Sequence, residues 1–263
     1  MEYKDKNMKL GFCGGVDLAS SIRSWGYDYV ELALAPLAQQ TDEEFAASLQ
    51  TLRESGLPCL ACNVFLPRSV PIVGPAVKRE DCLAYAKKAV GRAAQLGAKV
   101  IVLGSAGSRN IPAGFPGSQA LEQLRDFARI AAEEAAAYGI TIVIEPLNMI
   151  ESNIINRVSE GLLLALAVDH PNCKVLADTY HMQIEREGLE ALAQAGSELR
   201  HVHVSTFLGR KIPLAADKEA LKALFSQLQA IGYGGNVSIE AGFRNDQAAE
   251  ATEALQVMRG LLA

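Results

Sequence analysis

Short apolar runs recur along the chain, separated by longer segments with helical periodicity. Eight of these runs predict strands, at residues 10–13, 27–33, 57–65, 99–103, 140–144, 173–177, 200–204 and 236–239. Five runs follow a glycine that ends a helical segment, and glycine in that place adopts the left-handed conformation that closes a helix. The runs are nearly continuous rather than alternating, which indicates strands covered on both faces and hence a parallel sheet.

The intervening segments have the period of amphipathic helices. The apolar face of residues 121–138 consists of Leu121, Leu124, Ala128, Ala131, Ala135 and Tyr138. A capping box at Thr41 and Glu44 opens another helix, whose apolar face is Phe45, Leu49 and Leu52. Three further segments are each expected to be one helix, at residues 182–195, 218–230 and 246–262.

Eight strands alternating with helices form either a closed barrel or an open doubly wound sheet. No glycine-rich phosphate-binding loop follows any predicted strand, so a nucleotide-binding open sheet lacks its usual signature. We therefore predict an α/β chain that folds as one (β/α)8 TIM barrel domain over residues 1–263. The long loops at residues 67–78 and 104–117 are expected on the active-site face.

Charge and composition limit the partners and the compartment. The net charge of −5 argues against nucleic acid as the main partner, and no apolar run approaches the ~20 residues of a membrane span. Residues 1–6 carry charges of both signs and are not expected to be a signal peptide. Five cysteines with scattered spacing fit a reducing compartment, so a cytoplasmic protein is expected.

Cys59 and Cys62 have the spacing of half a zinc site. They lie in an apolar run that reads as a strand, in which positions three apart point to opposite faces. We therefore expect two separate buried cysteines whose thiols do not converge.

Ionisable side chains occur at the ends of the last four predicted strands. These residues are Glu145, Asp178, His203 and Glu240, and His201 precedes His203 on the same strand face. Each one alone is more often a cap, an ion-pair partner or a hydrogen-bonded core residue. Barrel enzymes place their chemistry at these strand ends, so the four together indicate a divalent-metal site. Three carboxylates and one imidazole suit Mn²⁺, Mg²⁺ or Co²⁺, with Zn²⁺ also possible.

Several motifs, mostly within residues 140–243, resemble one family. They are Glu145-Pro146-Leu147-Asn148, Glu151-Ser152-Asn153, Ile155-Asn156, Asp169-His170-Pro171-Asn172, Ala177-Asp178-Thr179-Tyr180-His181-Met182, His201-Val202-His203-Val204, Gly209-Arg210, Gly232-Tyr233-Gly234-Gly235 and Ser238-Ile239-Glu240. The family is the sugar isomerase/epimerase superfamily of xylose isomerase-like barrels. The nearest members resembled are the ketose 3-epimerases of the D-tagatose/D-psicose type.

The resemblance implies roles for particular residues. The family's metal ligands fall on Glu145, Asp178, His203 and Glu240, and its substrate contacts fall on three residues of this chain. These three are Glu151, His181 and Arg210. Without the resemblance, His181 could cap or pack locally, and Glu151 and Arg210 could be loop charges.

Several other residues either differ from those of the epimerases or are interpreted as structural or pocket-lining. Met149 and Arg157 depart from the residues common in the epimerases, and Arg210 lies one residue further from His203, so the sugar is not defined. His170 and His201 are interpreted as structural, with His201 alternatively a partner of His203. Glu31 and Asn63 are candidates to line the pocket.

The predicted function is a divalent-metal-dependent ketose 3-epimerase. A Lewis-acid metal would stabilise an enediolate while Glu145 and Glu240 exchange the roles of acid and base. Alternatives are an aldose–ketose or hydroxypyruvate-type isomerase, an inosose-type polyol dehydratase, and a sugar-binding barrel without chemistry. A metal nuclease of the same fold is a further alternative, but such nucleases bind several metals through many histidines, whereas this chain has four histidines and a net charge of −5. The expected partners are a sugar or sugar phosphate and further copies of the chain, as a dimer or tetramer.

Overall fold

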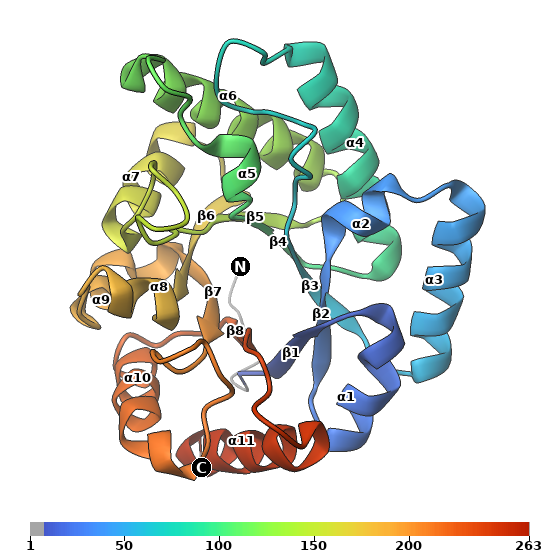
Figure 1. The fold of residues 1–263 in the computed structure, drawn as a ribbon, viewed down its shortest axis with the longest axis vertical. Helices are drawn as coiled ribbons and strands as arrows, with labels where there is room; N and C mark the ends of the chain where they lie inside the picture. The colour runs from blue at the N-terminus through green and yellow to red at the C-terminus, as the bar shows by residue number, and fades with distance from the viewer. Residues whose placement is uncertain (1–7, 263) are drawn as a thin grey trace.

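A computed structural model describes residues 8–262 as a closed barrel of parallel strands surrounded by helices (Figure 1). The strands are β1 Leu10–Gly14, β2 Tyr29–Ala33, β3 Cys59–Asn63, β4 Val100–Leu103, β5 Thr141–Ile144, β6 Cys173–Asp178, β7 Leu199–Val204 and β8 Asn236–Ile239. Each strand pairs with the next along the chain, and β1 also pairs with β8. The (β/α)8 prediction is confirmed. The expectation that residues 1–6 are not a signal peptide concerns a segment outside the described residues.

Helices connect the strands and cover the outside of the barrel (Figure 1). They are α1 Ala19–Trp25, α2 Leu34–Gln39, α3 Asp42–Ser55, α4 Arg79–Leu96, α5 Ala106–Arg109, α6 Gly117–Ala136, α7 Val158–Val168, α8 Thr179–Ile184, α9 Glu190–Ala195, α10 Lys218–Ala230 and α11 Gln247–Leu262. Short 3-10 turns occur at η1 Val16–Leu18, η2 Gly196–Glu198 and η3 Ala215–Asp217. The capping box of α3 is present, with Thr41 accepting from the Glu44 amide at 3.2 Å and Glu44 accepting from the Thr41 amide at 2.8 Å. No described helix is long and apolar enough to cross a bilayer.

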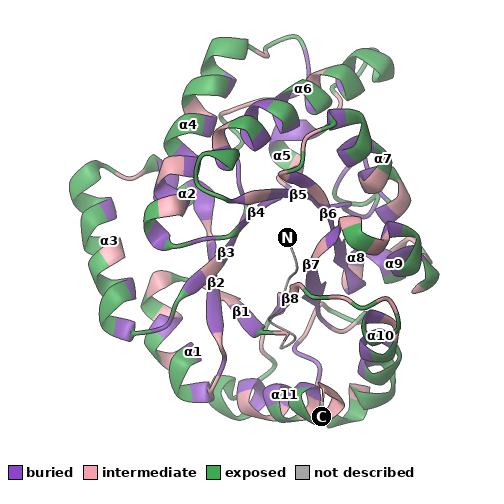
Figure 2. Cartoon of the chain, turned by 180° about the vertical axis from the view of Figure 1, so that it is seen from behind, coloured by how far each residue is buried: buried purple, intermediate pink, exposed green. Residues whose placement is uncertain are grey.

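The core has an inner and an outer layer, and the buried residues follow the strands and the barrel-facing sides of the helices (Figure 2). The inner cluster consists of Tyr29, Ala61, Val100, Val102, Val143 and Leu176. Tyr29 lies across the interior because its neighbour Gly11 has no side chain, and a Cβ there would overlap the tyrosine ring. Its hydroxyl lies 2.6 Å from Ser238 Oγ on β8, which links β2 to β8 across the intervening strand β1.

Two helical predictions need correction. Residues 182–195 form two helices, because the chain turns through a left-handed residue, Arg186, and Glu187 then accepts hydrogen bonds from the Val158 amide. Helix α6 ends at Ala136 before the left-handed Gly139, which leaves Tyr138 outside the helix and 51% exposed. Leu121 is on α6 but is 46% exposed. The predicted apolar face is therefore buried only in its middle.

Cys59 and Cys62 are both buried, as predicted, but the expectation that their thiols do not converge is wrong, because the two sulfur atoms lie 3.9 Å apart. The pairing of β2 with β3 shifts by one residue here, so that Val30 faces Cys59 while Glu31 faces Ala61. The extra residue in β3 brings the two side chains to the same side of the strand. Both thiols are free, and neither belongs to a metal-ligand group among residues 8–262.

The two long loops after β3 and β4 contact each other. The Leu66 amide donates to Ser105 Oγ at 3.0 Å, and the Ile72 amide donates to the Ser108 carbonyl at 2.8 Å. Helix α5 lies within the second loop and was not predicted. The contacts fix both loops beside the carboxyl ends of β3 and β4.

Candidate metal and substrate site

Four ionisable side chains converge at the carboxyl ends of neighbouring strands. Glu145 follows β5, Asp178 ends β6, His203 lies on β7, and Glu240 follows β8. One ligand atom from each residue lies within 4.8 Å of the ligand atoms of the other three. The Asp178 side chain also caps α8 by accepting from the Tyr180 amide at 2.7 Å, which fixes one of its oxygens. The barrel thus collects residues that are far apart in the sequence.

His203 is central to this group. Its Nδ1 atom lies 3.2 Å from Glu145 Oε1, 3.0 Å from Glu240 Oε2 and 4.0 Å from Asp178 Oδ2. Asn63, at the end of β3, donates to the other Glu240 oxygen at 2.9 Å. Each carboxylate therefore has an oxygen directed toward the imidazole nitrogen, and the group has the form of an acidic cage.

The donor set fits one divalent cation. Three carboxylate oxygens and one imidazole nitrogen are ligands that Mn²⁺, Mg²⁺ and Co²⁺ accept, and Zn²⁺ also takes such donors. Gly104 leaves the room for this arrangement, since a Cβ at that position would overlap Glu145 Oε2. The structure brings the four predicted ligands together, and their role as ligands stays a proposal.

Arg210 reaches into the cage from the loop after β7. Its Nη2 atom lies 2.8 Å from Asp178 Oδ2 and 2.5 Å from Glu240 Oε2, and its guanidinium lies over the Tyr180 ring. The residue has a positive φ of 49°, a conformation that is uncommon outside glycine. These contacts differ from those expected of a solvated loop cation.

The other two predicted substrate residues lie beside Arg210. Glu151 Oε1 is 4.0 Å from Arg210 Nη1, and His181 Nε2 is 3.7 Å from Asp178 Oδ2. His181 is 2% exposed, whereas the Glu151 side chain is 41% exposed. All three predicted substrate contacts therefore border the cage, with Glu151 at its rim.

Glu31 lies beneath the cage, inside the barrel, and is fully buried. One of its oxygens lies 2.9 Å from His203 Nε2, and the other lies 2.7 Å from His201 Nε2 and accepts from Ser238 Oγ at 2.6 Å. A carboxylate on the far nitrogen of a ligating histidine fixes its ring orientation and its tautomer. Glu31 thus supports His203 rather than lining the pocket, and His201 is its second partner.

Burial and mutual charge change the acidity of these groups. Burial raises the pKa of Asp178 to about 7, although Arg210 acts in the opposite direction. Burial also opposes ionisation of Glu240, but the charge of His203 outweighs it and holds the pKa of Glu240 at about 2. Burial and the nearby Arg210 lower the pKa of His181 to about 3, so this imidazole is neutral. The two carboxyl groups therefore differ in acidity, although both belong to the same cage.

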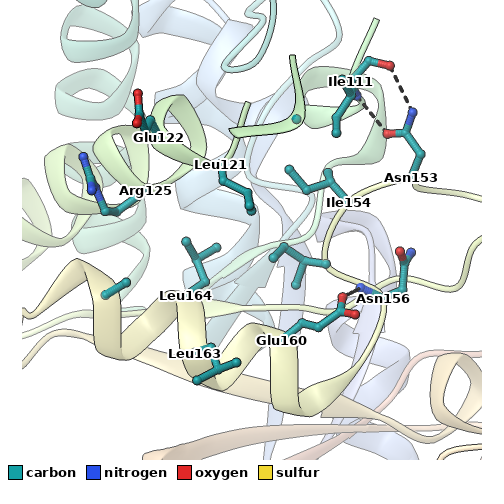
Figure 3. A pocket seen from close by; sticks show the side chains of 13 residues that line it. Ile111, Leu121, Glu122, Arg125, Asn153, Ile154, Asn156, Glu160, Leu163 and Leu164 are labelled. Atoms are coloured by element: carbon teal, nitrogen blue, oxygen red, sulfur yellow. Dashed lines mark hydrogen bonds between the residues drawn. The ribbon is translucent and has the colours of Figure 1, made fainter. Parts of the chain in front are cut away.

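Two cavities differ in how they lie relative to the cage. A groove of about 580 Å³ between α6 and α7 is lined by apolar side chains such as Leu121, Ile154 and Leu164, and no member of the cage borders it (Figure 3). A second cavity, of about 460 Å³, borders Glu240, Arg210 and Asn63. We assign the substrate to the second cavity, because of these two only the second places a ligand beside a carboxylate of the cage.

Sequence reasoning did not single out Asn148, Arg109 or Ser238. Asn148 is buried between His181 and Glu151. Arg109 is fully buried behind Glu145, where it donates to the Leu103 carbonyl at 3.0 Å, and burial lowers its pKa to about 10. Asn148 belongs to the family motif that begins at Glu145, and this membership was the sequence signal that could have identified it. Ser238 also stood within a family motif, but its contact with Glu31 joins residues 207 positions apart. Arg109 stood in no motif.

The fold and the site together define a class, the (β/α)8 barrels that carry a cluster of carboxylates and histidine at the carboxyl ends of their strands. The chain matches the family described as "Xylose isomerase-like TIM barrel" over residues 19–261, and it belongs to that family. The family predicted from the motifs is confirmed.

Two individual relatives within these comparisons are both named as epimerases. The chain is 28% identical over 230 residues to a "Probable ketose 3-epimerase" of Synechocystis sp., covering 83% of this chain and 75% of the relative. It is 26% identical over 242 residues to the "3-dehydro-D-guloside 4-epimerase" of Escherichia coli, covering 88% of both. These matches identify an enzyme of the isomerase class, an epimerase, as predicted.

The fold is also that of solved epimerases. A crystal structure of D-psicose 3-epimerase with D-tagatose from Clostridium cellulolyticum H10 aligns with a TM-score of 0.83 over 97% of this chain and 99% of the other. The identity is 24%, so this likeness concerns the fold.

Proposed function

We propose that the chain is a divalent-metal-dependent epimerase that inverts carbon 3 of a ketose. The observation that carries the proposal is the cage of Glu145, Asp178, His203 and Glu240 at the carboxyl ends of consecutive strands. The two relatives described above, which are named as epimerases, support it. Mn²⁺ is our first choice of ion, with Mg²⁺, Co²⁺ and Zn²⁺ as alternatives, and a homo-oligomer remains our expectation.

A divalent cation, when bound, supplies Lewis-acid polarisation of the carbonyl next to the reacting carbon. The chain's own residues then move the proton. Glu145 and Glu240 extend from strands that are separated by β6 and β7, so we assign one carboxylate to each face of the substrate carbon. One removes the proton and the other returns it from the opposite side, which inverts the carbon.

The surrounding side chains orient the two carboxylates and the substrate. Asn63 holds one Glu240 oxygen and Arg210 holds the other, which leaves the carboxylate little freedom to rotate. Glu151 and His181 supply an acceptor and a donor for sugar oxygens. Aldose–ketose isomerisation would use the same groups and return the proton to the adjacent carbon.

A second candidate is epimerisation at carbon 4 of a keto-glycoside. The Escherichia coli relative is named for this activity on a 3-dehydro-D-guloside, and the match covers 88% of both chains. Either reaction needs a proton removed next to a carbonyl, so the cage serves both.

Solvent isotope exchange tests the proposal. In D₂O with Mn²⁺, we expect deuterium at the sugar carbon next to the carbonyl, read by NMR across free ketoses, phosphorylated ketoses and 3-keto-glycosides. Glu240→Gln should abolish epimerisation, because an amide can neither take nor return the proton on its face of the carbon. The exposed Glu219 of α10 provides a matched control, Glu219→Gln. Epimerisation that persists in Glu240→Gln, or deuterium exchange that needs no metal, would contradict the mechanism.

A further inference from the structure

Asn148 is a fully buried amide in the segment between β5 and α7, three residues after Glu145. Its Oδ1 atom accepts from the backbone amides of Ile150 at 3.0 Å and Glu151 at 3.2 Å. Because only the oxygen of the side chain can accept, these two bonds fix which way the amide faces. The Nδ2 group therefore points away from its own loop, toward the site.

The Nδ2 group meets both neutral and acidic partners there. It donates to Glu151 Oε1 at 3.0 Å and lies 2.7 Å from His181 Nδ1. The backbone amide of Asn148 donates to the same Nδ1 atom at 3.1 Å. Two N–H groups thus converge on one imidazole nitrogen, which must present a lone pair to them. In a neutral histidine the proton is then on Nε2.

The opposite nitrogen of His181 is directed into the site. Within residues 8–262 its Nε2 atom is buried and has no hydrogen-bond partner, and it lies 3.7 Å from Asp178 Oδ2. A buried N–H without a partner is unfavourable, so a ligand oxygen beside Asp178 would relieve this cost. In this tautomer His181 donates to the substrate and does not take its proton.

We propose that Asn148 is a positioning residue that makes His181 a donor from Nε2 and holds Glu151 as an acceptor at the rim. One side chain thereby determines that His181 donates and Glu151 accepts, and these are two of the three proposed substrate contacts. The inference rests on the proposed function for the identity of the ligand. It does not rest on it for the tautomer of His181, which the contacts of Asn148 determine.

The substitution Asn148→Asp tests this with little change of shape. The aspartate keeps an oxygen for the Ile150 and Glu151 amides, and it replaces the Nδ2 donor with an acceptor. That acceptor repels Glu151 and favours a proton on His181 Nδ1. We expect kcat/KM to fall about 10–100-fold, as for other residues that orient a binding group. Asn153→Asp is the matched control, since Asn153 lies in the same loop and bonds to Ile111 instead.

The ring nitrogens give a readout that a purely structural role would leave unchanged. The chain has four histidines, so ¹⁵N NMR signals of His181 can be assigned by removing that residue alone. In the wild-type enzyme we expect a protonated Nε2 and an unprotonated Nδ1. In Asn148→Asp we expect a proton on Nδ1, while Asn153→Asp keeps the wild-type pattern.

The outcomes separate the two proposals. A wild-type His181 with its proton on Nδ1 would overturn the role of Asn148, and this measurement needs no variant to fold. An Asn148→Asp enzyme with the wild-type ring pattern and kcat/KM would overturn it as well. If no sugar in the panel exchanges deuterium, the proposed function fails, and the ring pattern still decides the role of Asn148.

Discussion

Single side chains in this barrel have two kinds of task, to face the ligand or to orient a residue that does. His203 has both kinds of partner, with carboxylates on Nδ1 and Glu31 on Nε2. Burial alone would raise the pKa of Glu31, but the charges of His203 and His201 hold it well below its usual range. An ionised Glu31 accepts the Nε2 proton and leaves Nδ1 for the site.

Replacing Glu31 with glutamine should weaken metal binding. The variant keeps the size of the side chain, but an NH2 group replaces one of the two carboxylate oxygens and the negative charge is lost. The amide therefore no longer holds the Nε2 proton of His203 as the carboxylate does. We expect the dissociation constant for Mn²⁺, measured by titration calorimetry, to rise about 10–100-fold. Tyr29→Phe serves as the control, because it removes a bond to Ser238 that lies one contact further away. A folded Glu31→Gln protein with wild-type affinity would refute the role of Glu31.

The apolar face of helix α6 is not buried evenly along its length, because the neighbouring elements cover only part of it. Leu124 is fully buried, whereas Leu121 lies one turn earlier, at the groove between α6 and α7, and is 46% exposed. The sequence assigned both residues to one apolar face. The groove beside α7 leaves the first of them partly in water.

The same substitution at these two positions should have unequal effects. Leu124→Ala leaves a cavity in the core, and we expect the free energy of unfolding to fall by about 2–5 kcal/mol. Leu121→Ala should cost about 1 kcal/mol or less, because much of that side chain is already hydrated. Chemical denaturation of both variants measures the difference. Equal losses would show that Leu121 is covered in solution, for example by a second copy of the chain.

The barrel as a unit concentrates negative charge at one end. The chain has a net charge of −5, and three carboxylates of the cage lie within a few ångströms of each other beside His203 and Arg210. A cation that binds only the folded chain stabilises it by mass action.

Metal should therefore raise the melting temperature. At a free Mn²⁺ concentration 100 times the dissociation constant, the stabilisation is about 2.7 kcal/mol, which corresponds to several degrees for a chain of this size. Thermal unfolding followed by circular dichroism, with Mn²⁺ and then with excess chelator, tests this. Asp178→Asn, which lacks one proposed ligand, should respond less. An identical melting temperature of the wild-type protein in both conditions would argue against a metal site in the cage.

Much of this molecule follows from local sequence. The strands and most helices were predictable because apolar period and helix-closing glycines depend on near neighbours. The predicted ligands were also visible, since a charge at the end of an apolar strand stands out, and in parallel strands these ends meet at one edge of the sheet.

Contacts across the barrel required the folded chain. Glu31 and His203 are separated by 172 positions, and Asn148 and His181 by 33, so no local pattern predicts that they meet. The approach of Cys59 to Cys62 depends on a one-residue shift in strand pairing, which is set by the neighbouring strand. Local sequence thus specified which residues could form a site, whereas strand register and barrel closure determined which side chains orient them, because those contacts form only when distant segments pack together.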